Sequence, residues 1–225
     1  MGFSYSVTAA SVPQTAVAGA GPPAAVARLT RARWAAAAIV VTAFCLRLGN
    51  LGGQSLWYDE AFSLLMARGD FGEIAGRTAL DTMPPLYYWL LHVWGVGVAV
   101  DFWPRLLSAL VGTLCVVLMY PLARQLFDPK AALAGMLITA AAPFQVFYSQ
   151  EVRMYTLLGV WCLLAGYGFL RGAHTGSRSG WVVFGLATAL AMYTHPLGGL
   201  PMEKVRERAA AALPQLLKVV REKQS

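Results

Sequence analysis

The chain has 225 residues, of which 57% are hydrophobic and only 13% charged, and its mean hydropathy is +0.54. Soluble domains carry about 25% charged residues, so the composition excludes disorder for most of the chain and argues against a water-soluble globule. The net charge of +7 lies in tails and short loops without a basic, aromatic stripe, which argues against nucleic acid as a partner. The three cysteines all lie in apolar runs, so we expect neither a disulfide framework nor a zinc site.

The N-terminal residues 1–33 are rich in Ala, Pro, Ser and Val and have no apolar period, which predicts a disordered cytoplasmic tail. Three arginines end this tail: Arg28, Arg31 and Arg33. They precede an apolar run, so we expect an uncleaved first span over residues 34–50 whose start is held in the cytoplasm. Arg47 is expected near the far interface, where its side chain can snorkel.

Four more uncharged runs have the length of a membrane span: 106–123, 131–148, 154–170, and 181 to just past 195. A helix rises 1.5 Å per residue, so about 20 residues cross the ~30 Å hydrocarbon core. The sequence therefore predicts an all-α, multi-pass helical membrane protein with about five transmembrane helices over residues 34–200. We expect its N-terminus in the cytoplasm and its location to be the inner membrane of a bacterial cell.

The uncharged segment 82–100 decides the topology, because every later segment changes side if it spans. Without that span, four basic residues lie in the cytoplasm: Arg124, Lys130, Arg171 and Arg178. With it, only two of the later arginines do: Arg105 and Arg153. The positive-inside rule therefore favours an interfacial aromatic helix within a first outer loop over about 51–103. Residues 201–225 form a basic, amphipathic helix of unclear origin, and their charge supports a six-span alternative.

Two clusters of chemically capable side chains lie in this first outer loop. Asp59 and Glu60 follow Trp57 and Tyr58, and they suit either a base or a metal-binding acid pair, or the N-cap and first-turn acid of a short helix. Asp81 precedes the double proline Pro84-Pro85, which would hold an acid rigidly as a metal or substrate ligand. The alternative for this second cluster is a proline-started interfacial helix with an aromatic belt.

A third cluster lies between two predicted spans. Glu151 and Arg153 are flanked there by Tyr148 and Tyr155, which suits a phosphate at the interface, whereas the alternative is a Glu151–Arg153 pair that closes a tight loop. Arg105 has the same possible phosphate role, or is an ordinary snorkelling arginine. In the five-span topology these clusters and His195 lie on one outer face, where acids and arginines can activate a hydroxyl and neutralise a lipid phosphate. Six spans would separate them.

With these residues in view, the sequence resembles the GT-C superfamily of glycosyltransferases, and within it the bacterial aminoarabinose transferase and protein O-mannosyltransferase-like group. Five segments in the family's order carry the resemblance: LWYDEA (56–61), PPLYYWLL (84–91), WPRLLSAL (103–110), YSQEVRMY (148–155) and YTH (193–195). The resemblance covers about residues 34–200 and implies the N-terminal part of a membrane enzyme. Such an enzyme takes a sugar from a polyprenyl-phosphate carrier at the outer face of the membrane.

The resemblance also implies roles for individual residues. Asp59 would be the catalytic base that deprotonates the acceptor, while three acids would bind a divalent cation or position the acceptor: Glu60, Asp81 and Glu151. Four residues would contact the carrier phosphate: Arg105, Arg153, Tyr148 and Tyr155. His195 is a further candidate on the outer face. The sugar would transfer with inversion to a lipid, glycan or protein acceptor.

Two departures from the family bear on these expectations. Met83 stands where the family often has His, which removes one potential metal ligand. Family members also run to several hundred residues, so we expect a truncated or fused form whose activity on its own is open. The alternative is a non-catalytic membrane fragment or assembly partner that binds membrane lipids and lipid carrier without turnover.

Overall fold

The computed structural model describes residues 24–81, 83–96 and 101–196, and all regular secondary structure in these ranges is helical. The helices are α1 (Ala24–Leu48), α2 (Tyr58–Met66), α3 (Phe71–Ala79), α4 (Leu86–Gly95), α5 (Phe102–Ala123), α6 (Pro129–Ala141), α7 (Pro143–Tyr148), α8 (Tyr155–Thr175) and α9 (Arg178–Thr194). The all-α prediction is confirmed for these residues. The predicted amphipathic helix over 201–225 and the first 23 residues of the predicted tail lie outside them.

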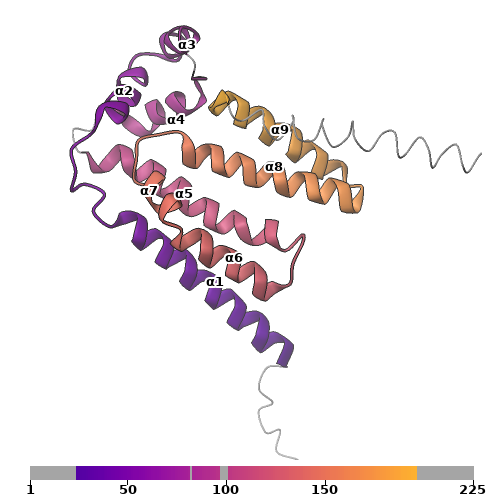
Figure 1. The fold of residues 1–225 in the computed structure, drawn as a ribbon. Helices are drawn as coiled ribbons and strands as arrows, with labels where there is room; N and C mark the ends of the chain where they lie inside the picture. Colours follow the sequence, from indigo (N-terminus) through magenta and orange to yellow (C-terminus); the bar gives the residue numbers. More distant parts are fainter. Residues whose placement is uncertain (1–23, 82, 97–100, 197–225) are drawn as a thin grey trace, which may run out of the picture.

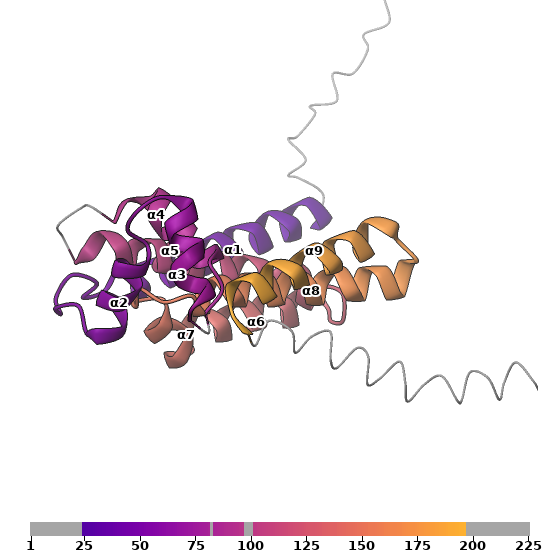
Figure 2. The ribbon, with the colours of Figure 1, turned by 90° about the horizontal axis from the view of Figure 1, so that it is seen from above.

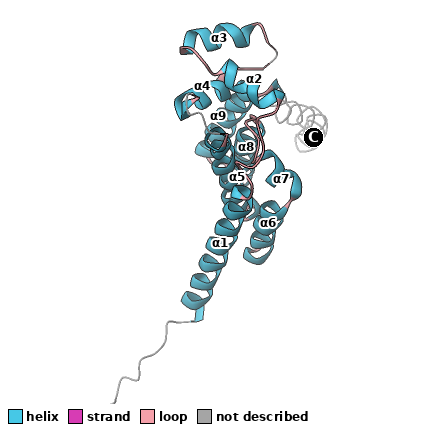
Figure 3. Cartoon of the chain, turned by 90° about the vertical axis from the view of Figure 1, so that its left-hand side faces the viewer, coloured by secondary structure: helices cyan, strands magenta, loops and turns pink. Residues whose placement is uncertain are grey.

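The helices form a bundle that carries a group of short helices at one end. The long helices α1, α5, α6, α8 and α9 pack side by side, with α5 in contact with α1, α6 and α8. Helices α2, α3 and α4 gather at the end of the bundle where α5 and α8 begin and α9 ends (Figures 1 and 2). In the view of Figure 3 this group lies at the opposite end from the start of α1. The polar outer-loop segment is therefore a structured cap on one end of the bundle.

Two of the described helices, α5 and α8, are long and apolar enough to cross a membrane, and α6 is a shorter apolar helix. Helices α1 and α9 occupy the first and last predicted spans. The chain is thus a helical protein with membrane-span-like helices, and the number of five spans stays a prediction.

The aromatic segment over 82–100 contains one short helix in its described part. Helix α4 has 10 residues and is therefore about 15 Å long, half of the hydrocarbon thickness. Its start follows Pro84-Pro85, and it buries Tyr87, Tyr88 and Leu91 against the rest of the chain. This length fits the interfacial alternative, in which all the outer-loop clusters stay on one side.

The first helix begins earlier than predicted. Helix α1 starts at Ala24, so residues 24–33, assigned from composition to the disordered tail, are helical. The stretch contains several alanines and arginines, which favour helix, and this propensity outweighs the lack of an apolar period. The boundary at residue 33 was wrong by ten residues.

The predicted span over 131–148 is not one continuous helix. Helix α6 ends at Ala141 and α7 begins at Pro143, with Ala142 between them at ψ 119°. Proline disfavours helical backbone at the preceding residue and has no N–H for the carbonyl four residues back, here that of Thr139. The chain therefore changes direction at Pro143, and the last carbonyls of α6 need donors from elsewhere.

Arg47 supplies these donors, and its position corrects the expectation that it snorkels. Its side chain is fully buried. Nη1 donates to the Ala140 carbonyl at 3.2 Å, Nη2 to that of Thr139 at 3.4 Å, and Nε to Ser149 Oγ at 3.1 Å. The guanidinium thus satisfies the backbone groups that the break at Pro143 leaves open, which is required where no water is available.

Helices α8 and α9 form the most extensive contact of the bundle, and glycines allow it. Gly168 and Gly172 are four residues apart on α8 and lie against Gly180 on α9. A Cβ at Gly168 would stand 2.5 Å from the Phe184 nitrogen and 2.8 Å from the Gly180 oxygen, both backbone atoms. This is the small-residue packing through which apolar helices approach closely in membranes.

We therefore expect Gly168→Ala to destabilise the protein by about 2 kcal/mol, because the backbone of α9 has to move away. Gly185→Ala, on α9, is the matched control, since a Cβ there meets no atom within 4 Å. Thermal unfolding of both variants in detergent checks this difference. Equal midpoints for the two variants would contradict the close packing.

Candidate active site

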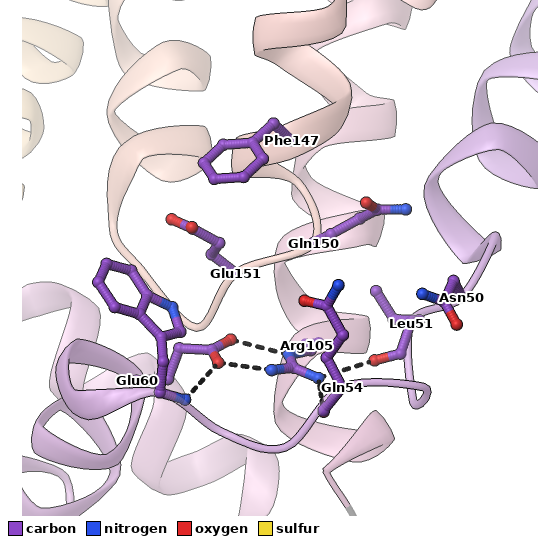
Figure 4. Close-up of a pocket in the computed structure, with 9 residues that line it drawn as sticks. Asn50, Leu51, Gln54, Glu60, Arg105, Phe147, Gln150 and Glu151 are labelled. Atoms are coloured by element: carbon purple, nitrogen blue, oxygen red, sulfur yellow. Dashed lines mark hydrogen bonds and ion pairs between the residues drawn. The ribbon is translucent and has the colours of Figure 1, made fainter.

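A buried ion pair between Glu60 and Arg105 lies at the base of the predicted outer loop. Glu60 is in the first turn of α2, and Arg105 is in the first turn of α5. Arg105 Nε donates to Glu60 Oε1 at 2.8 Å, and Nη2 donates to Oε2. The Glu60 side chain is 0% exposed and that of Arg105 6%, so this is a bidentate pair removed from water (Figure 4).

Both partners use all of their hydrogen-bonding capacity. The remaining N–H groups of Arg105 donate to the carbonyls of Leu51, Gln54 and Ser55. Glu60 also accepts from the backbone N–H of Val152 at 3.0 Å and of Trp57 at 3.3 Å, the latter being half of a capping box at the start of α2. A guanidinium has five N–H donors and a carboxylate about four lone-pair positions, and every one is occupied.

These contacts favour a structural role for Glu60 and Arg105, and their predicted ligand-binding roles stay predictions. Glu60 has no lone pair left for a cation or an acceptor, and Arg105 has no N–H left for a carrier phosphate. The alternative of Glu60 as a first-turn acid is the one that the geometry fits. The pair joins the segments 51–55 and 149–154 to the starts of α2 and α5.

Asp59, by contrast, opens into a pocket that brings together residues distant in sequence. The pocket has a volume of about 240 Å³, and its polar lining includes Asp59, Asp81 and Arg153. The Asp59 carboxylate Oδ2 lies 3.9 Å from Arg153 Nη2, and its side chain remains 39% exposed. One acid from each outer-loop cluster therefore meets the arginine of the third cluster, at the capped end of the bundle.

Arg153 differs from Arg105 in how few of its donors have good partners. Its Nη1 lies 3.5 Å from the Asp59 carbonyl and its Nη2 3.5 Å from the Tyr155 hydroxyl, both long contacts, and its guanidinium lies 5.6 Å from the centre of the Tyr155 ring. Its buried Nε has no hydrogen-bond partner within the described part of the chain. A cation held by an aromatic ring with spare donors suits an anionic ligand.

Tyr88 also lines this pocket, and sequence reasoning missed it. The residue is 0% exposed, and its hydroxyl has no hydrogen-bond partner among the described residues. Burial raises the pKa of Tyr88 to about 12, so its hydroxyl is a neutral donor at physiological pH. The sequence pattern around Tyr88 is typical of an aromatic belt. The feature that points to the pocket is its position three residues after the double proline, on the inner face of a short helix.

The other aromatic candidates form a row beside the pocket. The rings of Tyr148 and Tyr155 lie 4.7 Å apart, and those of Tyr155 and His195 6.0 Å apart. Tyr148 packs also against Phe144 and Phe147 of α7. Burial, together with the charge of Arg153, lowers the pKa of His195, so the imidazole is neutral near pH 7. Tyr155 also contacts the Arg153 guanidinium.

Glu151 lies in a different cavity from Asp59. This second cavity, of about 140 Å³, has a polar lining that includes Gln54, Gln150 and Glu151 together with the paired Glu60 and Arg105 (Figure 4). Burial and repulsion by Glu60 raise the pKa of Glu151. Its carboxylate makes no ion pair with Arg153 within 4.0 Å, so the alternative of a Glu151–Arg153 pair that closes a tight loop is not formed. The backbone N–H of Arg153 donates instead to the Glu151 carbonyl at 2.9 Å.

A metal site built from protein side chains alone is not formed by the described residues. Nowhere among them do three or more His, Cys, Asp or Glu side chains come together in a ligand set. Asp59 and Asp81 supply two carboxylates to one pocket, with a guanidinium beside them. Magnesium bound by so few protein ligands takes further oxygens from substrate phosphates and water.

Comparison with known protein families gives one match, to the dolichyl-phosphate-mannose-protein mannosyltransferase family, over residues 82–201. The match covers more than half of the chain. The chain belongs to this family. A search of curated proteins gave no match, and neither did a search of solved structures.

The family match confirms the resemblance seen in the sequence motifs. The chain is therefore a member of a family of membrane glycosyltransferases of the GT-C type. The matched range begins just before the double proline that precedes α4 and ends shortly after His195. It therefore contains Arg105, Glu151 and Arg153. The segment with Asp59 and Glu60 lies before it. In the structure these two parts meet at the Glu60–Arg105 pair and in the Asp59–Arg153 pocket.

We expect Glu60→Gln to destabilise the protein by about 3 kcal/mol, because it leaves the Arg105 charge buried without its partner. Glu73→Gln, which removes the exposed i,i+4 pair with Arg77, should change stability by less than about 1 kcal/mol. Chemical unfolding in detergent measures both variants. A loss no larger for Glu60→Gln than for Glu73→Gln would contradict the structural role of the buried pair.

Proposed function

We propose that the chain carries the reaction centre of a transferase that moves a sugar from a polyprenyl-phosphate carrier to an acceptor hydroxyl. One observation carries the proposal: Asp59, Asp81, Arg153 and Tyr88 line one pocket at the capped end of the bundle. Family membership supports the reaction class. The pocket combines an exposed carboxylate with an under-used guanidinium, the two groups that a hydroxyl acceptor and a phosphate leaving group need.

Asp59 is the proposed base. Its carboxylate is exposed and bonded only loosely, which leaves an oxygen free to take the acceptor proton, whereas the adjacent Glu60 carboxylate is saturated. Asp81 is exposed, lines the same pocket and is proposed to position the acceptor. We assign Glu151 no direct role, since it lies in the other cavity.

Arg153 and Tyr88 are the proposed partners of the carrier phosphate, with Tyr155 holding the guanidinium. The free Nε of Arg153 and the buried Tyr88 hydroxyl are donors that a phosphate oxygen would satisfy. Tyr148 and His195 then act through Tyr155, against whose ring both of them pack.

In the proposed reaction the acceptor oxygen attacks the anomeric carbon as its proton passes to Asp59. The bond between that carbon and the phosphate oxygen breaks, the configuration inverts, and the carrier phosphate leaves with its electron pair. Arg153 stabilises the developing charge on this phosphate. A divalent cation would fit here only between Asp59, Asp81 and substrate oxygens.

The proposed setting is the outer face of a bacterial cytoplasmic membrane, with the N-terminus in the cytoplasm. The carrier's tail stays in the bilayer, so its phosphate lies at interface level. The described pocket lies at the same level as the start of α5, a candidate span, and beside the short aromatic helix α4. The basic turns after α5 and α8 lie at the other end of the bundle, consistent with a cytoplasmic position.

We expect Asp59→Asn to lower donor consumption by about 10²- to 10⁴-fold, the usual contribution of a general base. Asp70→Asn is the matched control, because Asp70 caps α3 outside the pocket and asparagine caps a helix as well as aspartate does. The assay incubates membranes containing the full chain with polyprenyl-phosphate sugars and follows the lipid fraction by mass spectrometry.

Two outcomes would contradict the proposal. If Asp59→Asn consumes donor at the rate of the unmodified chain, Asp59 is not the base. If the unmodified chain binds a polyprenyl-phosphate sugar but consumes none, the chain is a carrier-binding protein without turnover, which was the alternative left open by the sequence.

A second test concerns the Tyr88 hydroxyl, which has no hydrogen-bond partner among the described residues. Tyr88→Phe should leave the unliganded protein equally stable or slightly more so, since it removes a buried, unsatisfied polar group. It should weaken donor binding or turnover by about tenfold, the value of one hydrogen bond to a charged group. Unfolding and turnover are measured on the same preparation. A marked loss of stability with full turnover would assign Tyr88 to the core instead.

A further inference from the structure

A larger cavity lies at the end of the bundle opposite to the proposed reaction centre. It has a volume of about 660 Å³ and lies where the start of α1 meets the end of α5 and the start of α6. Three cations line it, one from each of these elements or the turn beside them: Arg31, Arg124 and Lys130. Tyr120 and Leu133 contribute apolar walls. The volume falls within the range of small-molecule and lipid sites.

The charge of this cavity is not balanced by protein acids. Asp128 is its one acid, and its Oδ1 accepts from the Ala131 N–H at 2.8 Å as the N-cap of α6. In the described part of the chain, none of the three cations makes an ion pair within 4.0 Å: the pairs found there are Glu73–Arg77, Glu60–Arg105 and Asp59–Arg153. The cavity therefore has a positive charge that calls for an external anion.

The apolar residues around the cavity indicate which kind of molecule supplies this anion. Helix α5 is a candidate span, and α6 is a short apolar helix that packs against it. Next to the cavity, in the turn between them, Leu126 is 55% exposed and Phe127 59% exposed. Exposed apolar side chains next to basic ones are typical of the headgroup level of a membrane, where basic recesses between helices bind acidic lipids.

We propose that this cavity binds the headgroup of an anionic phospholipid, with the phosphate between Arg31, Arg124 and Lys130. The lipid's acyl chains then run along the apolar surfaces of α1, α5 and α6 toward the middle of the bundle. The site is separate from the Asp59–Arg153 pocket at the capped end, so it does not depend on the proposed transfer reaction.

The test uses the full chain in detergent micelles with a fluorescent phosphatidylglycerol. Its displacement is followed with unlabelled phosphatidylglycerol, phosphatidylcholine and glycerol 3-phosphate. The double variant Arg124→Gln/Lys130→Gln should bind phosphatidylglycerol about tenfold more weakly. The control is Arg171→Gln/Arg178→Gln, which removes the same charge from the α8–α9 end of the bundle, outside the cavity. Its affinity should stay within about twofold of the unmodified chain.

Support requires that phosphatidylglycerol displace the probe much better than phosphatidylcholine and glycerol 3-phosphate do. Equal loss of affinity in the two double variants would overturn the proposal, because binding would then follow surface charge alone. Equal displacement by phosphatidylcholine would overturn the anionic specificity. Equal displacement by glycerol 3-phosphate would make the cavity a site for soluble phosphates and overturn the lipid assignment.

Discussion

The ion pair between Glu60 and Arg105 is the interaction on which the arrangement of this protein's candidate site depends. Removing two charges from water is costly unless their hydrogen-bonding groups are all satisfied. Here they are satisfied by each other and by backbone groups from two segments, residues 51–57 and Val152, so the pair exists only when these segments lie together with the start of α5. The pair thereby fixes the cap of α2, α3 and α4 on the end of the bundle, and Arg47 satisfies the backbone carbonyls that the break at Pro143 leaves open.

The same constraint separates two adjacent acids. Asp59 and Glu60 are neighbours in the first turn of α2, so their side chains point in different directions, and burying one leaves the other at the surface. Arg105 and Arg153 are divided in the same way, one with every donor used and one with donors to spare. The saturated Glu60–Arg105 pair therefore lies next to the Asp59–Arg153 pair, whose loose contacts can be replaced by contacts with a ligand.

Much of the fold could be predicted from the sequence, because long uncharged runs can be buried only as helices in a chain of this composition. The site was harder to predict. The structure brings Asp59, Asp81 and Arg153 into one pocket, while the side of the membrane on which this pocket lies stays a prediction. The pairing of Glu60 with Arg105 depends on tertiary contacts between positions far apart in sequence, which charge pattern does not reveal. Pro143 by itself predicts the helix break, whereas the uncharged run around it is typical of one continuous span.

The most direct test of this account is carboxyl labelling of the folded protein with a carbodiimide and an amine, resolved residue by residue by tandem mass spectrometry. The account predicts that Asp59 is labelled in the native protein, while Glu60 is protected until the protein unfolds. Labelling of Glu60 at a rate similar to that of Asp59 would contradict it. The outer loop would then not be held by a closed ion pair, and the basis for distinguishing the two acids would be lost.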